Sequence, residues 1–188
     1  MLIKREDCCL LVIDVQDRLL PAMNDPKGVI AGCRRLLVAA REAGVPVLVT
    51  EHYPAGLGPT AAVLGDLVPA GAVMEKINFS CFAEPSVRRR IRDTGRRTLV
   101  LAGMEAHVCL GQSALDLNAA GYQVVVPPDA TASRTRLDHE TALFRLEREG
   151  AVIADTGAIL DAWAGSAEAG FPERAGGRGD GTRLAGLS

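Results

Sequence analysis

The stretch that decides the fold lies at residues 8–14 and reads CCLLVID, six apolar residues followed by a carboxylate. A continuous apolar run of this length is typical of a strand buried on both faces, as in a parallel sheet. Similar runs recur along the chain at residues 45–49, 72–74, 98–102, 122–126 and 151–153. The sequence therefore predicts six parallel strands, of which residues 8–13 form the first.

Helical segments alternate with these runs. Residues 29–43 carry apolar side chains at helical spacing, and Gly44 follows where a C-cap glycine belongs. The same pattern of helix, glycine and strand recurs at residues 85–93, 108–120 and 138–149. Strands that alternate with helices predict an α/β fold, a three-layer α/β/α sandwich with helices on both faces of the sheet.

Composition bounds the organisation. The chain has 188 residues, which corresponds to about one domain. We expect the folded domain to span residues 1–164. Residues 165–188 contain seven of the twenty glycines and few large apolar side chains, so they are expected to form a Gly-rich, flexible C-terminal tail.

Charge and cysteine content exclude several classes of partner. The net charge of −2 gives no electrostatic reason to expect nucleic acid or an acidic membrane as a partner.

No apolar run approaches the roughly 18 residues of a membrane span, and the first residues do not resemble a signal peptide. The five cysteines are odd in number and lack a CxxC motif. We therefore expect a cytoplasmic protein with reduced thiols.

Three reactive side chains follow three different strands. Asp14 comes directly after the first strand, Lys76 follows the third, and Cys109 stands near the start of the helix after the fourth. Ligands of an open α/β sheet bind beyond the carboxyl ends of its strands, so the three groups are expected to meet there. The helix N-terminus and the lysine would lower the thiol pKa. Asp14 could then move the thiol proton during attack on an amide or ester carbonyl.

Other interpretations of these residues remain open. A free cysteine is often a small buried hydrophobe, an aspartate after a strand often caps a turn, and a lone lysine is usually solvated. The three residues are therefore credible as catalytic groups only as a set. A nucleotide-binding oxidoreductase would suit the same topology, but the first turn lacks both GxGxxG and GxxxxGK[ST].

Four segments resemble the isochorismatase-like cysteine hydrolases, a family that includes nicotinamidases. These segments are residues 11–16, 75–82, 101–109 and 129–134, and the similarity extends over about residues 6–163. The resemblance implies a six-stranded, Rossmann-like parallel sheet in the order 3-2-1-4-5-6. It also implies Cys109 as nucleophile, Asp14 as general base and then acid, and Lys76 as their charged partner.

The resemblance further implies a cis peptide bond before Glu105. This bond would turn the backbone N–H groups of Glu105 and Cys109 toward the substrate oxygen as an oxyanion hole. We also expect five residues to line the substrate pocket: Gln16, His52, Tyr53, Phe79 and Phe82.

The family comparison also bears on metals and assembly. Nicotinamidase-like members hold a metal with an Asp-x-His pair and a second histidine after the second strand. Here that place reads Glu51-His52-Tyr53-Pro54, at the start of a Gly/Pro-rich stretch over residues 50–59 that is expected to be a loop. We therefore expect neither a metal nor another cofactor. Residues 51–60 look like the isochorismatase domain-containing subgroup, and the resemblance implies a homo-oligomer.

The sequence thus predicts a cysteine hydrolase that acts on a small amide, carbamoyl or ester substrate through an acyl-enzyme intermediate. Hydrolysis of a C–N bond is the favoured reaction. The alternative is a non-catalytic member of the same fold that serves as a binding or scaffold protein.

Overall fold

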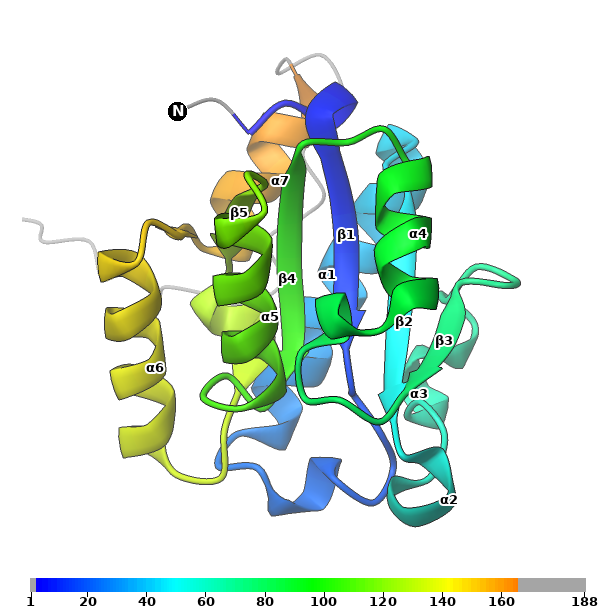
Figure 1. Ribbon diagram of the computed structural model, residues 1–188, viewed down its shortest axis with the longest axis vertical. Helices are drawn as coiled ribbons and strands as arrows, with labels where there is room; N and C mark the ends of the chain where they lie inside the picture. The colour runs from blue at the N-terminus through cyan, green and yellow to red at the C-terminus, as the bar shows by residue number, and fades with distance from the viewer. Residues whose placement is uncertain (1–2, 166–188) are drawn as a thin grey trace, which may run out of the picture.

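The computed structural model describes residues 3–165, so the predicted tail at residues 165–188 lies outside the described part except for Gly165. Within that part the sheet has seven strands, all paired in parallel, in the order β3-β2-β1-β4-β5-β7, with β6 paired to β4 (Figure 1). The strands are β1 (Cys8–Ile13), β2 (Val47–His52), β3 (Val73–Lys76), β4 (Thr98–Met104), β5 (Gln123–Val126), β6 (Thr131–Ala132) and β7 (Val152–Ile153).

The predicted α/β fold and the order of the six predicted strands are confirmed. The predicted count of six is one too low, because β6 adds a seventh strand. This strand has two residues, Thr131 and Ala132, and unlike the two-residue strand β7 it does not lie in an apolar run of the sequence.

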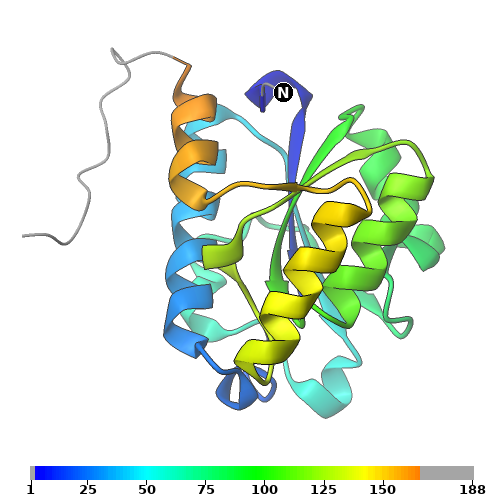
Figure 2. The same ribbon diagram turned by 90° about the vertical axis from the view of Figure 1, so that its left-hand side faces the viewer.

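Two helical layers cover the sheet. The helices are α1 (Pro26–Ala43), α2 (Pro54–Leu57), α3 (Ala62–Gly65), α4 (Pro85–Asp93), α5 (Cys109–Ala119), α6 (Arg136–Arg148) and α7 (Thr156–Ala164). Helices α1 and α7 lie on one face, and α4, α5 and α6 lie on the other (Figures 1 and 2). No helix in the described part is long and apolar enough to cross a membrane.

Strand β1 explains why both faces are covered. Its side chains alternate, so that Leu10 and Val12 pack with the α1 and α7 layer while Leu11 and Ile13 pack with the α4, α5 and α6 layer. All six residues of the strand are buried. Each fully buried aliphatic side chain contributes about 1.5–3 kcal/mol, so the helices of both layers are held mainly by this central strand and its neighbours.

The carboxyl edge of the sheet is built by a close approach of β1 and β4. Gly103 pairs with Ile13 and has φ +117°. A Cβ atom at this position would lie 2.1 Å from the carbonyl oxygen of Ile13. Glycine is therefore required here, and its small size brings the ends of β1 and β4 together.

Strand β2 is longer than its apolar run predicts. It continues to His52, where Thr50, Glu51 and His52 pair with β3. The prediction of a loop from residue 50 is wrong, because the two flanking strands bury polar residues at the end of β2 and give their backbone groups partners. The short helix α2 follows within the remainder of that segment.

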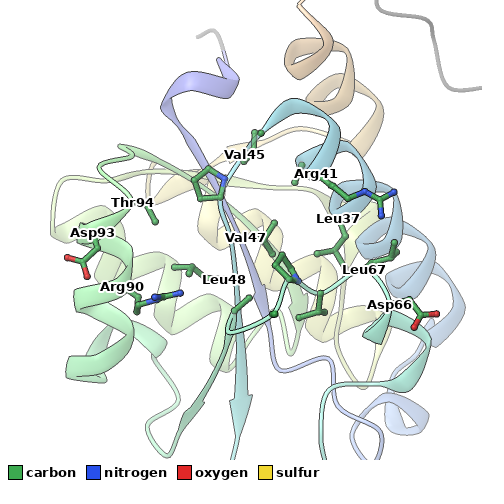
Figure 3. Close-up of a pocket in the computed structure, with 17 residues that line it drawn as sticks. Leu37, Arg41, Val45, Val47, Leu48, Asp66, Leu67, Arg90, Asp93 and Thr94 are labelled. Atoms are coloured by element: carbon green, nitrogen blue, oxygen red, sulfur yellow. The ribbon is translucent and has the colours of Figure 1, made fainter.

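A cavity of about 670 Å³ lies at the opposite, amino edge of β2 (Figure 3). The end of α1, residues 45–48, residues 66–70 and the end of α4 form its walls. Arg41 and Arg90 lie on opposite sides of it. The cavity is thus separate from the edge at which Asp14, Lys76 and Cys109 lie.

Candidate active site

Asp14 is fixed immediately after β1. Its backbone has φ 54°, a left-handed conformation that is uncommon for a residue other than glycine. The Asp14 N–H donates to the Thr50 carbonyl at 3.0 Å, and the Thr50 hydroxyl donates to Asp14 Oδ1 at 2.7 Å. The end of β2 therefore orients the carboxylate through both a backbone and a side-chain contact.

Lys76 meets this carboxylate from the edge strand β3. Its Nζ lies 2.7 Å from Asp14 Oδ2, and both side chains are completely buried. The same Nζ donates to the carbonyl oxygens of Asn78 and Phe79, each at 3.1 Å. Three acceptors thus match the three N–H groups of the ammonium, which makes a buried charge tolerable.

Cys109 is the first residue of α5, and its thiol interacts with both Asp14 and Lys76. The structure therefore brings the three predicted catalytic side chains together. Burial, followed by the negative charge of Asp14, raises the pKa of the Cys109 thiol to about 12, and the opposite effect of Lys76 is smaller. The expected lowering of the thiol pKa is wrong for the resting protein, because removal from water outweighs the nearby positive charge.

The peptide bond between Met104 and Glu105 is cis, which confirms that expectation. The Glu105 carbonyl accepts hydrogen bonds from the N–H groups of Val108 (3.0 Å) and Leu110 (3.2 Å), which folds residues 105–110 into a tight turn. Within residues 3–165, the N–H groups of Glu105 and Cys109 donate to no other group. Two backbone donors are thus left free in the turn that carries the thiol.

The comparisons with known proteins agree with this geometry. A model of the isochorismatase domain matches residues 8–158. The chain belongs to the isochorismatase family. Isochorismatase domain-containing protein 1 of Danio rerio is 40% identical over 153 residues, which are 81% of this chain and 52% of the fish protein. The chain therefore spans about half the length of that curated relative.

Solved structures extend the isochorismatase-family likeness. The MAR1 ribonuclease from Caenorhabditis elegans matches with a TM-score of 0.84 and 30% identity, covering 90% of this chain and 88% of that chain. The YcaC gene product from Escherichia coli, described as an octameric hydrolase of unknown specificity, matches with a TM-score of 0.83 and 21% identity. That match covers 90% of this chain and 87% of the other, and at this identity it shows the fold alone.

The predicted pocket residues of this isochorismatase-family chain take different positions. His52 and Phe79 lie together, with their ring centroids 5.5 Å apart. Phe79 and Tyr53 are about half exposed. Phe82 instead packs edge-on against Tyr122, with centroids 5.8 Å apart. The structure therefore gives Phe82 packing partners other than the three candidate catalytic side chains.

Gln16 holds a loop of the site in place. It is fully buried, accepts from the His52 N–H at 2.8 Å, and donates to the Gly58 carbonyl at 2.6 Å. Glu51 anchors the same loop, because its Oε1 accepts from both the N–H and the hydroxyl of Thr60 at 2.6 Å. The predicted pocket role of Gln16 is thus accompanied by an anchoring role in the structure.

Sequence reasoning missed three residues that organise the site, namely Thr50, Glu84 and Ser113. Thr50 orients Asp14 as described above. Glu84 Oε1 accepts from the N–H groups of Ile77 and Asn78 and so fixes the segment after Lys76. Ser113 connects that segment to α5. Thr50 and Ser113 act between elements far apart in the chain, and Glu84 acts across a turn of seven residues. No motif in the sequence indicated any of the three contacts.

No cluster of three potential metal ligands occurs in the described part of the chain. Glu51, at the place where nicotinamidase-like members hold a metal, is engaged by Thr60. His107, two residues before Cys109, contacts the hydroxyl of Ser133 through Nδ1 at 2.9 Å. These side chains serve local structure at the site.

Proposed function

We propose that this isochorismatase-family protein is a cysteine hydrolase acting on a small amide, carbamoyl or ester substrate, with hydrolysis of a C–N bond as the favoured reaction. The observation that carries the proposal is the fully buried pair of Asp14 and Lys76, 2.7 Å apart, with both of which the thiol of Cys109 interacts. A buried ion pair is weak evidence for stability, but a thiol with a raised pKa beside a buried carboxylate and ammonium is typical of active sites.

The first half-reaction follows from these contacts. Asp14 accepts the Cys109 proton as sulfur attacks the carbonyl carbon, and the N–H groups of Glu105 and Cys109 stabilise the oxyanion that forms. Asp14 then gives that proton to the departing amine or alcohol as its bond to carbon breaks. A thioester on Cys109 remains, and Lys76 keeps the carboxylate in position.

Water completes the cycle. Asp14 removes a proton from the water that attacks the thioester, and the carbon–sulfur bond breaks to release the acid. The cysteine regains its proton from Asp14. Because the resting thiol pKa is about 12, sulfur needs this base at the moment of attack, which supports a catalytic role for Asp14.

We also propose a homo-oligomer, which is supported by the description of the structurally similar YcaC protein as octameric. The five free cysteines support a reducing compartment such as the cytoplasm. The proposed partner is a small molecule, with neither nucleic acid nor a membrane as a partner.

A mass-spectrometric screen tests the proposed function. The protein is incubated with small amides, carbamoyl compounds and esters, and each sample is analysed for hydrolysis and for an acyl adduct on Cys109. We expect an adduct and turnover with at least one compound, and loss of both in Cys109→Ala. Cys33→Ala is the matched control, because it removes a buried thiol on the opposite face of the sheet.

Two outcomes would overturn the hydrolase proposal. Turnover that persists in Cys109→Ala would exclude the thiol as nucleophile. Absence of any adduct or turnover across the three compound classes would favour the non-catalytic binding or scaffold protein.

Single-stranded RNA is included in the screen because the C. elegans relative is called a ribonuclease, and a phosphodiester cannot form an acyl adduct.

A further inference from the structure

Two buried polar groups near the candidate site have no partner. Within residues 3–165, five buried side-chain nitrogen or oxygen atoms make no hydrogen bond. Three of them have another polar neighbour: Asp14 Oδ2 faces Lys76, Glu105 Oε2 faces Arg134, and the Trp163 side chain contacts the Cys8 thiol. The two that remain are His52 Nδ1 and Ser80 Oγ.

Such atoms are rare in native proteins, because a buried polar group without a partner has lost its hydration and gained nothing in return. His52 and Ser80 are also both neighbours of Phe79. The His52 ring contacts the Phe79 ring, and Ser80 follows Phe79 in the chain. Their position at the carboxyl edge therefore requires an explanation.

Ser80 lies in the segment that follows Lys76. This segment contacts helix α5, which begins with Cys109, through Ser113. The carbonyl before it, that of Phe79, accepts from Lys76 Nζ. The N–H after it, that of Cys81, donates to the Ser113 hydroxyl at 2.9 Å, and this hydroxyl donates to the Cys109 carbonyl at 2.6 Å. The two residues next to Ser80 in the chain are therefore linked to Lys76 on one side and, through Ser113, to Cys109 on the other.

The segment is also fixed at its start. Glu84 Oε1 accepts from the N–H of Ile77 at 2.9 Å, and from the N–H and side-chain amide of Asn78 at 3.0 and 2.8 Å. With Glu84 at one end and Ser113 at the other, the backbone around Ser80 is constrained. Only 6% of the surface of Ser80 is exposed, and its Oγ is buried. The hydroxyl is therefore held away from solvent.

Charge at the site is balanced without a substrate. The carboxylate of Asp14 and the ammonium of Lys76 neutralise each other at 2.7 Å. Burial, with a smaller effect of Lys76, lowers the pKa of His52, so the imidazole is neutral at pH 7. A substrate with a net charge would lose its hydration and find no opposite charge left over at these residues.

We propose that the Ser80 hydroxyl and the His52 imidazole are the polar groups that bind the substrate, and that the substrate is an uncharged carboxamide or carbamoyl compound. Each group makes a hydrogen bond to a polar atom near the reacting carbonyl and so gains the partner that it lacks. This inference rests on the proposed function, since it takes Cys109 as the nucleophile. It adds Ser80 to the predicted pocket residues.

Alkylation of Cys109 tests recognition separately from hydrolysis. Iodoacetamide and iodoacetate are a matched pair, one an uncharged amide and the other an anion. In both reactions the thiol sulfur bonds to the methylene carbon, iodide leaves, and the thiol proton is released. The rate at Cys109 is measured by mass spectrometry, and the ratio of the two rates is compared with the ratio for glutathione.

We expect Cys109 to favour iodoacetamide by at least about tenfold beyond the glutathione ratio. Ser80→Ala should lower the iodoacetamide rate by about tenfold, the effect of one hydrogen bond, and change the iodoacetate rate less than about twofold. His52→Phe should act in the same direction. If the wild-type ratio equals that of glutathione, or if Ser80→Ala leaves it unchanged, the proposal is overturned.

Stability distinguishes binding from a structural role. Ser80→Ala removes a hydroxyl without a partner, so we expect the urea midpoint to stay the same or to rise. Ser113→Ala is the matched control, because it removes a buried hydroxyl with two hydrogen bonds and should lower the midpoint. A fall in Ser80→Ala equal to that in Ser113→Ala would contradict the proposal. Selective alkylation without hydrolysis of any amide would refute the proposed function and support only the binding of an uncharged amide next to Cys109.

Discussion

Two aspartates at different places in the fold are bound in similar ways. Asp14 accepts from the Thr50 hydroxyl and faces Lys76. Asp129 accepts from both the N–H and the hydroxyl of Thr156, and it faces Arg35 at 3.6 Å. Each cluster therefore joins a carboxylate, a threonine and a cation from separate elements.

Exposure separates the two clusters. The side chains of Asp14 and Lys76 are 0% exposed, whereas those of Asp129 and Arg35 are 42% and 50% exposed. Water screens the second pair, so it serves mainly to connect α1, α7 and the turn at residues 128–130. The first pair has lost its hydration, and a dry carboxylate next to a thiol is available for chemistry. Similar contacts thus serve different purposes according to their burial.

The largest expected effect comes from Asp14→Asn, which removes the base but keeps the shape of the side chain. We expect turnover to fall by about 10²–10⁴-fold. Unfolding free energy should also fall by about 3–5 kcal/mol, because Lys76 is left buried without a counter-charge. Steady-state kinetics and urea unfolding measure the two effects. Wild-type turnover in this variant would place the proton transfer elsewhere.

The double variant Asp14→Asn/Lys76→Met separates stability from activity. Removing both charges leaves no unpaired ion, so we expect this protein to be more stable than Asp14→Asn by about 1–4 kcal/mol, while turnover remains lost. Urea unfolding of the wild type, both single variants and the double variant completes the cycle. A double variant less stable than either single one would show that the two losses simply add, so that removing the second charge relieves no unpaired ion.

Alkaline pH should affect thiols on both sides of the comparison. Burial raises the pKa of Cys33, near Asp129, and of Cys109, near Asp14, to about 12 in each case. Unfolded thiols lose their protons near pH 9, whereas the folded ones keep them until about pH 12. The unfolded state then binds fewer protons, so stability is unaffected below about pH 9 and falls as pH rises through this window.

Urea unfolding at pH 8 and pH 10 measures this fall. Each such thiol contributes about 1.4 kcal/mol per pH unit within the window. Cys33→Ala should reduce the slope by that amount relative to the wild type. An unchanged slope in Cys33→Ala would show that this thiol ionises in the folded protein at its ordinary pKa.

The smallest effect is expected from Asp129→Asn, the counterpart of the first variant. The exposed ion pair contributes about 0–1 kcal/mol, and the asparagine still has a carbonyl oxygen for one of the two Thr156 contacts. Unfolding free energy should fall by about 1 kcal/mol, with turnover within about twofold of the wild type. If Asp129→Asn lost as much turnover as Asp14→Asn, the cluster at Asp129 would have to be catalytic rather than structural.

Much of the scaffold could be predicted from the sequence because buried parallel strands leave continuous apolar runs. The run at residues 8–13 coincides with β1, and the expected helix at residues 85–93 coincides with α4. The failures occur where polar residues are buried by tertiary contacts. His52 ends β2 rather than a loop, and the two residues of β6 pair with β4 without any periodic signal.

The site, like the scaffold, contains features that the sequence indicates and features that only tertiary contacts determine. Asp14, Lys76 and Cys109 could be predicted to meet because each follows a strand of one sheet, and the structure brings them together. The direction of the Cys109 pKa could not be predicted, since it depends on how far folding removes the thiol from water. Ser80 gave no signal either, because the absence of a hydrogen-bond partner is a property of the folded chain.

The close approach of β1 and β4 at Gly103 limits which substitutions this protein can accept. Position 103 holds a residue with φ +117° whose neighbour leaves no room for even one methyl group. A library with all twenty amino acids at this codon, sorted for expression and sequenced, should return glycine nearly alone. Related proteins with this fold can therefore differ in the loops around the site and in what those loops bind. Position 103 must remain glycine.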